Sequence, residues 1–422
     1  MSRKMKPSGI EWIGDIPEEW EVCRVKNYFS NHKIIVGDKS SVYQRLALTL
    51  SGVIKRSKED SSGLQPEAFN GYQILKENEL VFKLIDLENI STSRVGLSPF
   101  IGIVSPAYIV LEGKNVNMKY SEFYFLSMWQ RCIFNQMGDD GVRSSLNSND
   151  LLNTSFVYPP LTEQYQISSY LDTKCAHIDN IIEKTKDSIE EYKKLKQAVI
   201  TQAVTKGIRG DRPMKDSGIE WIGEIPEEWQ LEKFKYIASV KSNLVNPNNY
   251  QDYLQVAPDN IEKGTARLLD CKTVQENGIE SSNHLFYKGQ IIYSKIRPIL
   301  NKVIIAPFDG LCSADMYPIE TIIDTHFLVY MMLSDLFLYQ VKLVTENRVK
   351  MPKINQEELG RLLVCVPTIS EQHEIAAYLD KKCAEIDAVI TKKQQFITEM
   401  ESYKKSLIFE CVTGKRRCQL AK

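Results

Sequence analysis

The chain has 422 residues, of which 43% are hydrophobic and 25% are charged, a composition typical of folded globular domains. Its formal net charge of −1 provides no general basic excess, so any binding of nucleic acid must rest on local basic patches or on a partner that supplies charge. Nine irregularly spaced cysteines, no apolar leader and no apolar run near the ~20 residues of a membrane span predict a soluble, cytoplasmic protein with reduced thiols.

The chain opens on a segment that it repeats at its middle. Residues 8–20 read SGIEWIGDIPEEW and residues 217–229 read SGIEWIGEIPEEW, with one difference in thirteen positions. Each copy has two tryptophans, which bury large apolar areas when a chain folds. We expect both copies of this entrance segment to dock through their tryptophans on a second surface that is itself repeated, rather than to stack on nucleic-acid bases.

Each entrance segment leads into a variable block, residues 21–158 and residues 230–366, and the two blocks share little sequence. Both contain short runs of β-type residues separated by clusters of glycine, serine and asparagine. Such runs predict short strands bounded by turns. We expect each block to fold as a mixed α/β (α+β) globule of about 150 residues.

A second repeat follows each variable block. Residues 161–179 (LTEQYQISSYLDTKCAHID) return at 369–387 as ISEQHEIAAYLDKKCAEID. Apolar residues then recur at alternating three- and four-residue spacing until Gly207 or Gly414, and glycine is a typical helix terminator. The pattern predicts two helices of about 40–45 residues that pair as an antiparallel coiled coil. The chain is therefore expected to be a tandem duplication with pseudo-twofold symmetry.

Motifs for catalysis or metal binding are missing from the sequence. There is neither a G-x-x-x-x-G-K-[ST] phosphate loop nor a G-x-G-x-x-G dinucleotide loop. The five histidines are scattered, and His177, two residues after Cys175, is replaced by Glu385 in the repeat. We therefore predict no catalytic residue, no metal site and no cofactor for this chain.

Three features together make the sequence distinctive: the doubled Trp-Ile-Gly-x-Ile-Pro-x-x-Trp segments, the Pro-x-x-x-Glu-Gln start of each long helix, and the duplication at an offset of about 208 residues. On these features the whole chain resembles the specificity subunit of type I restriction-modification systems, which serve in phage defence. The resemblance implies two target-recognition domains, each reading one half of an asymmetric, bipartite site in double-stranded DNA. It also implies that the paired helices set the spacer between the two halves.

The same resemblance implies partners, and no catalysis by the chain itself. Two methyltransferase subunits would dock on the helices, and restriction (motor-nuclease) subunits would join them. Methyl donor, ATP and magnesium would belong to these partner subunits. In these terms we expect recognition domains at residues 1–158 and 209–366, spacer helices at 159–208 and 367–415, and a tail at 416–422.

Contacts with DNA phosphates and bases come mainly from lysine, arginine and small polar side chains. Basic clusters in loops of the first block suggest Lys55, Arg56, Lys58, Lys83, Arg94 and Arg143 as contacts. Those of the second block suggest Lys263, Arg267, Lys295, Arg297, Lys302, Arg348, Lys350 and Lys353. For each of these residues, an ordinary solvated surface charge is the alternative interpretation.

Two other functions fit parts of the sequence. The repeats are consistent with a duplicated coiled-coil scaffold that binds two copies of a protein without touching DNA. An enzyme that acts directly on nucleic acid is a third hypothesis, which the missing catalytic motifs disfavour.

Overall fold

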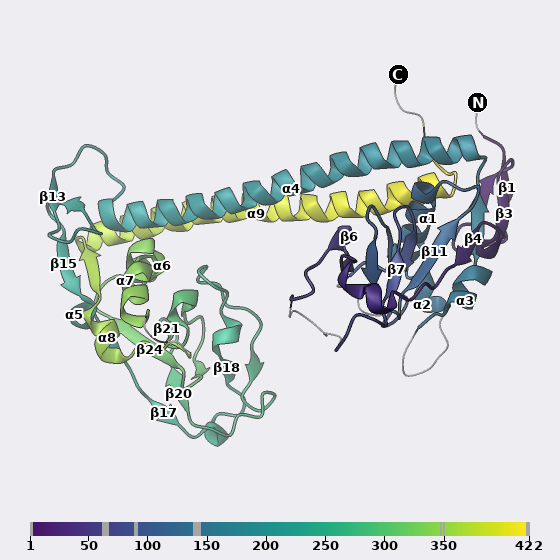
Figure 1. Cartoon of the computed structure of the whole chain (residues 1–422). Helices are drawn as coiled ribbons and strands as arrows, with labels where there is room; N and C mark the ends of the chain where they lie inside the picture. The colour runs from purple at the N-terminus through teal and green to yellow at the C-terminus, as the bar shows by residue number, and fades with distance from the viewer. Residues whose placement is uncertain are drawn as a thin grey trace. The chain divides into compact units, whose positions relative to one another are not determined.

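The computed structural model describes residues 3–60, 67–87, 92–137, 145–346, 348 and 351–418. The chain divides into two compact units, Met1–Thr185 with Gln395–Lys422, and Lys186–Gln394. Each unit contains a mixed globule of strands and helices together with one end of each long helix, α4 (Leu161–Lys206) and α9 (Ile369–Val412) (Figure 1).

The first unit is built on a four-stranded antiparallel sheet in the order β4-β11-β8-β9. Aromatic rings fill its core: Phe125 of α1 meets Phe82 edge to face, with ring centroids 5.0 Å apart, and also packs on Phe156. The strands of this unit are β1 (Met5–Pro7), β2 (Asp15–Pro17), β3 (Glu21–Arg24), β4 (Phe29–Asn31), β5 (Leu46–Thr49), β6 (Gly52–Lys55), β7 (Gln73–Leu75), β8 (Leu80–Phe82), β9 (Val95–Leu97), β10 (Gly102–Val104), β11 (Ile109–Gly113) and β12 (Ser155–Tyr158). Its short helices are α1 (Met118–Gln130), α2 (Ile133–Gln136) and α3 (Ser148–Asn153).

The second unit has a four-stranded antiparallel sheet in the order β16-β24-β21-β22 and a five-stranded sheet in the order β17-β20-β23-β18-β19. Its strands are β13 (Met214–Asp216), β14 (Glu224–Pro226), β15 (Gln230–Lys233), β16 (Ala238–Val240), β17 (Leu244–Val245), β18 (Leu254–Val256), β19 (Lys272–Thr273), β20 (Asn283–Phe286), β21 (Ile291–Ser294), β22 (Val303–Ile305), β23 (Gly310–Cys312), β24 (Met316–Thr321) and β25 (Leu363–Val366). Its short helices are α5 (Phe234–Ile237), α6 (Thr325–Leu333), α7 (Asp335–Thr345) and α8 (Gln356–Arg361).

None of the helices in the described part of the chain is by itself long and apolar enough to cross a membrane. Helices α6 and α7 reach that threshold only when taken together, and they are bent by 60° relative to each other. Many of their apolar side chains are buried in the core of the second unit.

The duplication extends to parts of the structure where the two halves share little sequence. The sheets β4-β11-β8-β9 and β16-β24-β21-β22 share strand order and direction, although the variable blocks share little sequence. Each block also begins and ends on two strands that pair with each other: Glu21 lies opposite Tyr158, and Gln230 lies opposite Val366. These features confirm the mixed α/β class and the tandem duplication.

The two long helices, of 46 and 44 residues, have nearly the predicted lengths. They run antiparallel in both units: Lys404 Nζ lies 2.6 Å from Asp179 Oδ2 in the first, and Lys196 Nζ lies 2.6 Å from Asp387 Oδ2 in the second. Partly exposed ion pairs contribute up to about 1 kcal/mol each. The buried apolar side chains between the two helices therefore stabilise the coiled coil, and the two equivalent ion pairs favour one register.

The glutamine of each repeated Glu-Gln pair joins a long helix to its globule. The side-chain oxygen of the buried Gln164 accepts a hydrogen bond from the Asn117 backbone amide (2.9 Å) at the start of α1. The Gln372 side-chain oxygen accepts one from the Asp324 amide (2.8 Å) at the start of α6. Because both bonds use a backbone donor, this joint does not depend on the side chain that the variable block supplies.

The glutamate of the pair binds the entrance segment. Trp20 and Trp229 are fully buried, and their indole nitrogens donate to Glu163 Oε2 (2.8 Å) and Glu371 Oε2 (3.0 Å). A buried indole N–H needs a partner, and the glutamate at the same position of each repeat provides one. The predicted docking of each entrance segment on the repeated helices is therefore confirmed.

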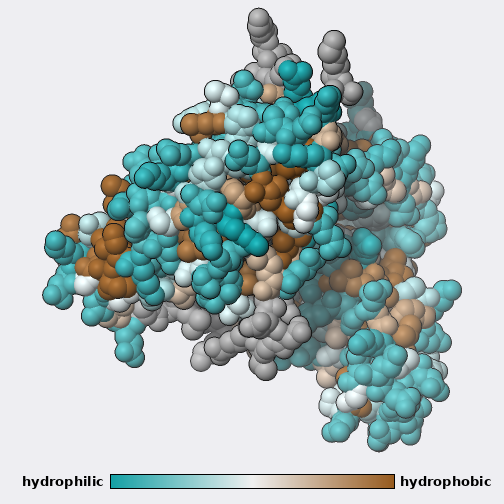
Figure 2. All heavy atoms as spheres, turned by 90° about the vertical axis from the view of Figure 1, so that its right-hand side faces the viewer, coloured by the Kyte–Doolittle hydropathy of each residue, from teal (hydrophilic) through white to brown (hydrophobic). Residues whose placement is uncertain are grey.

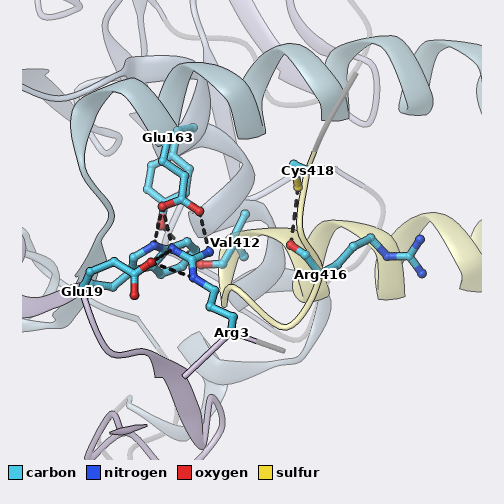
Figure 3. Close-up of polar contacts among 8 residues, drawn as sticks. Arg3, Glu19, Glu163, Val412, Arg416 and Cys418 are labelled. Atoms are coloured by element: carbon cyan, nitrogen blue, oxygen red, sulfur yellow. Dashed lines mark hydrogen bonds and ion pairs between the residues drawn. The ribbon is translucent and has the colours of Figure 1, made fainter. Parts of the chain in front are cut away.

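An arginine completes each of these docks. Arg3 donates to Glu163 at 2.6 and 2.8 Å and also to Glu19, and Figure 3 shows its side chain pointing to both carboxylates. The hydrogen bond to Glu163 is the largest cause that raises the pKa of Arg3. In the second unit Arg212 contacts Glu371 in the same way. The sequence pattern did not single out either arginine.

The first tryptophan of each entrance segment is not a buried anchor, so that part of the prediction is wrong. Trp12 is half-buried, with its ring 5.8 Å from Tyr124 and 6.3 Å from Phe409. Trp221 remains 37% exposed, and its ring centroid lies 5.7 Å from that of Tyr339. The second tryptophan of each segment is buried against a glutamate of a long helix, whereas the ring of the first remains partly accessible.

The two predicted helix terminators lie beside the docks. Gly207 and Gly414 have φ angles of +79° and +73°, a left-handed conformation that favours glycine. A side chain at Gly414 would overlap Pro17, and one at Gly207 would press on Trp229. These glycines therefore end the helices and leave room for the entrance segments.

Candidate nucleic-acid interface

Three loops of the second unit carry most of its basic candidates. The hairpin 261–268 carries Lys263 and Arg267, the loop 295–302 follows β21, and the loop 351–354 precedes α8. We call these three loops the loop cluster.

Backbone hydrogen bonds hold the loop cluster together. The Arg297 amide donates to the Pro352 carbonyl oxygen (2.8 Å), and an antiparallel bridge beside this bond joins the same two loops. The Gly264 amide donates to the Asn301 carbonyl oxygen (3.1 Å), which connects the hairpin to the loop after β21. Loops that are remote in sequence therefore form one surface.

The loop cluster is rich in left-handed backbone. Ala266, Arg297, Asn301 and Met351 have φ angles of 57°, 44°, 46° and 46°. Such conformations cost about 1–3 kcal/mol each, persist only where the surroundings enforce them, and concentrate at ligand-binding sites. The backbone of Arg297 is thus held in a defined conformation while its side chain is exposed.

Several cations of the loop cluster are available to a ligand. Lys263, Arg267 and Arg297 are exposed, and none forms an ion pair with a carboxylate of the residues that the structure describes. Lys353 is also exposed and lies 3.1 Å from Asp315. Exposed ion pairs are weak, so a phosphate can replace this carboxylate at little cost.

Other basic candidates of this unit are engaged within the protein. Lys302 is largely buried, and its Nζ donates to the Pro258 carbonyl oxygen at 2.7 Å. The Lys295 ammonium lies 5.4 Å from the centroid of a tyrosine ring. Arg348 contacts Glu358, and that hydrogen bond raises the pKa of Arg348. These contacts favour structural roles for the three side chains.

In the first unit, a basic stretch follows β6. Lys55 is exposed, and its Nζ lies 4.7 Å from the centroid of the Phe100 ring. Arg56 Nε is 2.8 Å from Asp60 Oδ2, and Lys58 Nζ donates to a backbone carbonyl oxygen at 2.7 Å. Of these three residues, Lys55 is the most accessible to DNA.

The structure corrects the prediction for Arg94, which lies in the interior and not at the surface. Its side chain is 0% exposed and donates to the Asp86 carbonyl oxygen. Lys83 is half-buried, and burial lowers its pKa, with the charge of Arg94 as the second cause. Arg143 and Lys350 lie outside the described residues.

The sequence pattern missed the residues that shape the loop cluster. Gly264 and Asn301 form the bond that joins two of its loops, and Asn301 also donates through its side chain to the Met332 carbonyl oxygen (2.9 Å). The available signal was that glycine and asparagine adopt left-handed backbone more readily than most residues. Within the described residues, no group of three or more His, Cys, Asp and Glu side chains is arranged to hold a metal ion.

Comparisons with known proteins match both halves of the chain. The family model described as the type I restriction modification DNA specificity domain matches residues 17–191 and 226–399. The chain is 33% identical over 289 residues to the type I restriction enzyme EcoDI specificity subunit of Escherichia coli, which is 65% of this chain and 65% of that relative. It is 25% identical over 425 residues to the MjaVIII specificity subunit of Methanocaldococcus jannaschii, covering 95% of this chain and 94% of the relative.

A solved structure supports the fold. A chain from work on the complex assembly and conformational transition of the type I R-M system matches with a TM-score of 0.72 and 12% identity. The match covers 95% of this chain and 99% of that chain. At this identity, the likeness concerns the arrangement of secondary structure.

Proposed function

Because the chain belongs to the family of type I restriction-modification DNA specificity proteins, we propose that it is the DNA-recognition subunit of such a system in its host. Each variable block reads one half of a bipartite, asymmetric site in double-stranded DNA. The coiled coil of α4 and α9 sets the spacer between the halves. The alternative of a scaffold that does not bind DNA does not fit a family defined by DNA specificity domains.

One observation carries the proposal: two divergent blocks are held by two equivalent docks. Trp20 and Trp229 bind Glu163 and Glu371 in the same way, whereas the loops that the blocks present differ in sequence. Constant joints with variable loops are the arrangement expected of a protein whose target changes while its assembly does not.

The proposal assigns the chemistry to partner subunits. The chain itself is not an enzyme; it recruits two methyltransferase subunits and, where present, restriction subunits. Methyl donor, ATP and magnesium belong to those partners. The net charge of −1 is compatible with DNA binding because the partners help to enclose the duplex. The complex acts in the cytoplasm.

A methylation map of the genome tests the proposed function. Cells that carry this gene with its methyltransferase should methylate adenine at a split, asymmetric motif. Cells that lack only this gene should lose that motif. An unchanged map, with the methyltransferase shown to be active, would contradict the proposal.

Arg297 is the side chain of the loop cluster that we expect to contribute most to sequence discrimination. Arg297→Ala should weaken binding to the mapped target by about 1–3 kcal/mol, because an exposed arginine can make two hydrogen bonds to guanine. Arg297→Lys should retain binding to a scrambled duplex but lose most of the discrimination, because an ammonium lacks the two-pronged geometry. Titrations of both duplexes at several salt concentrations measure this, and equal loss on both would indicate a phosphate contact instead.

A further inference from the structure

One helix of the second block, α6, lies against the coiled coil and is bound to it at both ends (Figure 1). At its start, the Asp324 amide donates to the Gln372 side-chain oxygen of α9. At its end, the Gln197 side chain of α4 donates to the Leu333 carbonyl oxygen (2.6 Å). Both bonds use main-chain atoms of the block, so they hold the ends of α6 without specifying its side chains.

Between these ends, a side chain of α6 bonds to the long helix. The Tyr330 hydroxyl donates to Asp380 Oδ1 of α9 at 2.7 Å, and His326 Nδ1 lies 3.9 Å from Oδ2 of the same carboxylate. Burial raises the pKa of Tyr330, and the hydrogen bond to Asp380 raises it further, so the hydroxyl remains a donor at neutral pH. We call the contact between Tyr330 and Asp380 the α6 latch.

The first unit uses the equivalent carboxylate in the same way. Asp172 occupies the position of Asp380 in the helix repeat, and Lys119 of α1 lies 3.4 Å from it, in the longer of its two ion pairs. When α1 and α6 are aligned on the residues whose amides bind the repeated glutamines, Phe123 replaces Tyr330 and carries no hydroxyl. Two divergent blocks therefore reach one repeated carboxylate with chemically different side chains, which indicates that the contact itself is required.

Neither stability nor solubility accounts for this contact. The side chains of Asp172 and Asp380 are 51% and 54% exposed, and exposed contacts of charged groups add little to the free energy of unfolding. Figure 2 shows hydrophilic residues over much of the surface of the first unit, on the side that carries β1 and β3, so solubility does not depend on one more carboxylate. The contact can still determine where α1 or α6 lies on its long helix.

In the second unit, α6 is joined directly to the loop cluster. Asn301 donates through its side chain to the Met332 carbonyl oxygen of α6 (2.9 Å), and its own carbonyl oxygen accepts a hydrogen bond from the hairpin 261–268. The tip of that hairpin also lies near the latch, because Thr265 and Ala266 border the same hollow of about 390 Å³ as the two latch residues. A displacement of α6 would therefore move the loop cluster with it.

We propose that Tyr330 and Asp380 are positioning residues for recognition of the second half-site: the latch holds α6 at one place on the long helix, and α6 holds the loop cluster at one orientation to the DNA. The inference rests on the proposed function and extends it to side chains outside the loop cluster. With the latch intact, the loops meet their half-site at one spacing. Without it, α6 can shift between its bonded ends, and the complex accepts spacers of other lengths.

Tyr330→Phe in the full-length chain, bound to its methyltransferase, tests the proposal because it removes only the hydroxyl. Tyr339→Phe is the matched control: Tyr339 is an exposed tyrosine of α7, and its hydroxyl has no hydrogen-bond partner among the described residues. Fluorescence anisotropy titrations measure the affinity for duplexes that carry the mapped target with its own spacer, or with a spacer one base pair longer or shorter. Urea denaturation measures the stability of each variant.

We expect Tyr330→Phe to reduce the preference for the native spacer about tenfold, the loss typical of one hydrogen bond to a charged group. The urea midpoint and the discrimination at the first half-site should stay as in the wild type and the control. An unaltered spacer preference, or an equal loss of affinity for every duplex in parallel with a loss of stability, would overturn the latch. A wild-type complex that does not prefer the split target to a scrambled duplex would overturn the proposed function as well, so the two failures are distinguishable.

A double-mutant cycle tests whether the two residues act as one contact. Asp380→Ala should relax the spacer preference at least as much as Tyr330→Phe. The variant with both substitutions should relax it no further than Asp380→Ala alone, because the contact is already lost. Additive effects of the two substitutions would show that the residues act separately, and would overturn the latch.

Discussion

Trp229→Ala is expected to destabilise the second unit by about 3–5 kcal/mol, whereas Trp221→Ala, in the same segment, is expected to cost about 1 kcal/mol or less. Trp229 is 0% exposed and packs in a core that includes Val204 of α4 and Leu379 of α9. Its removal leaves a cavity and takes one hydrogen-bond donor from the buried Glu371. Trp221 loses mainly its contact with the ring of a surface tyrosine.

Urea denaturation followed by circular dichroism measures the difference between these two variants. Hydrogen exchange of peptides from residues 186–394 locates it in the second unit. Equal destabilisation by the two substitutions would contradict the assignment of Trp229 as the anchor. The corresponding pair in the first unit, Trp20→Ala and Trp12→Ala, should show the same order of effects.

Exchange of residues 21–158 for the variable block of a related specificity protein is expected to change one half of the methylated motif and leave the other half and the spacer unaltered. The exchange carries β3 and β12 together, so the strand pair that closes the block is transferred intact. The entrance segment, Glu163 and Gln164 remain in place. Gln164 needs only a backbone amide from the incoming block, which any sequence other than proline supplies.

A methylation map of cells that carry the hybrid chain reads the outcome directly. The reciprocal exchange of residues 230–366 is the control, because its ends are the paired strands β15 and β25. It should change the other half of the motif alone. A change in both halves from a single exchange would refute independent recognition by the two blocks.

The repeated parts of this protein were predictable because the chain can be compared with itself. Sequence repetition within the chain identified the entrance segments and the long helices. The three- and four-residue spacing of apolar residues, with Gly207 and Gly414, gave the extent of the helices. Both signals are local, since helical periodicity and a terminating glycine act within a few turns of one helix. The boundaries of the variable blocks also coincide with the strand pairs that close them.

The candidate interface was predictable only in part. Clusters of lysine and arginine indicated the loops that contain Lys263, Arg267 and Arg297, which the structure leaves exposed. The same criterion selected Arg94, whose side chain is buried, and Lys302, whose side chain is largely buried. The residue type alone does not show whether a basic side chain is exposed or buried, because its accessibility depends on segments far along the chain.

The sequence by itself determined the family, the duplicated architecture and the constant docking of two variable blocks, because these depend on repetition and local periodicity. Only the tertiary structure decided which tryptophan of each entrance segment is buried, which arginine joins the glutamate that binds it, and which loops meet around Arg297. The physical reason is that burial and hydrogen bonding between segments distant in sequence arise from packing in three dimensions, which no local pattern records.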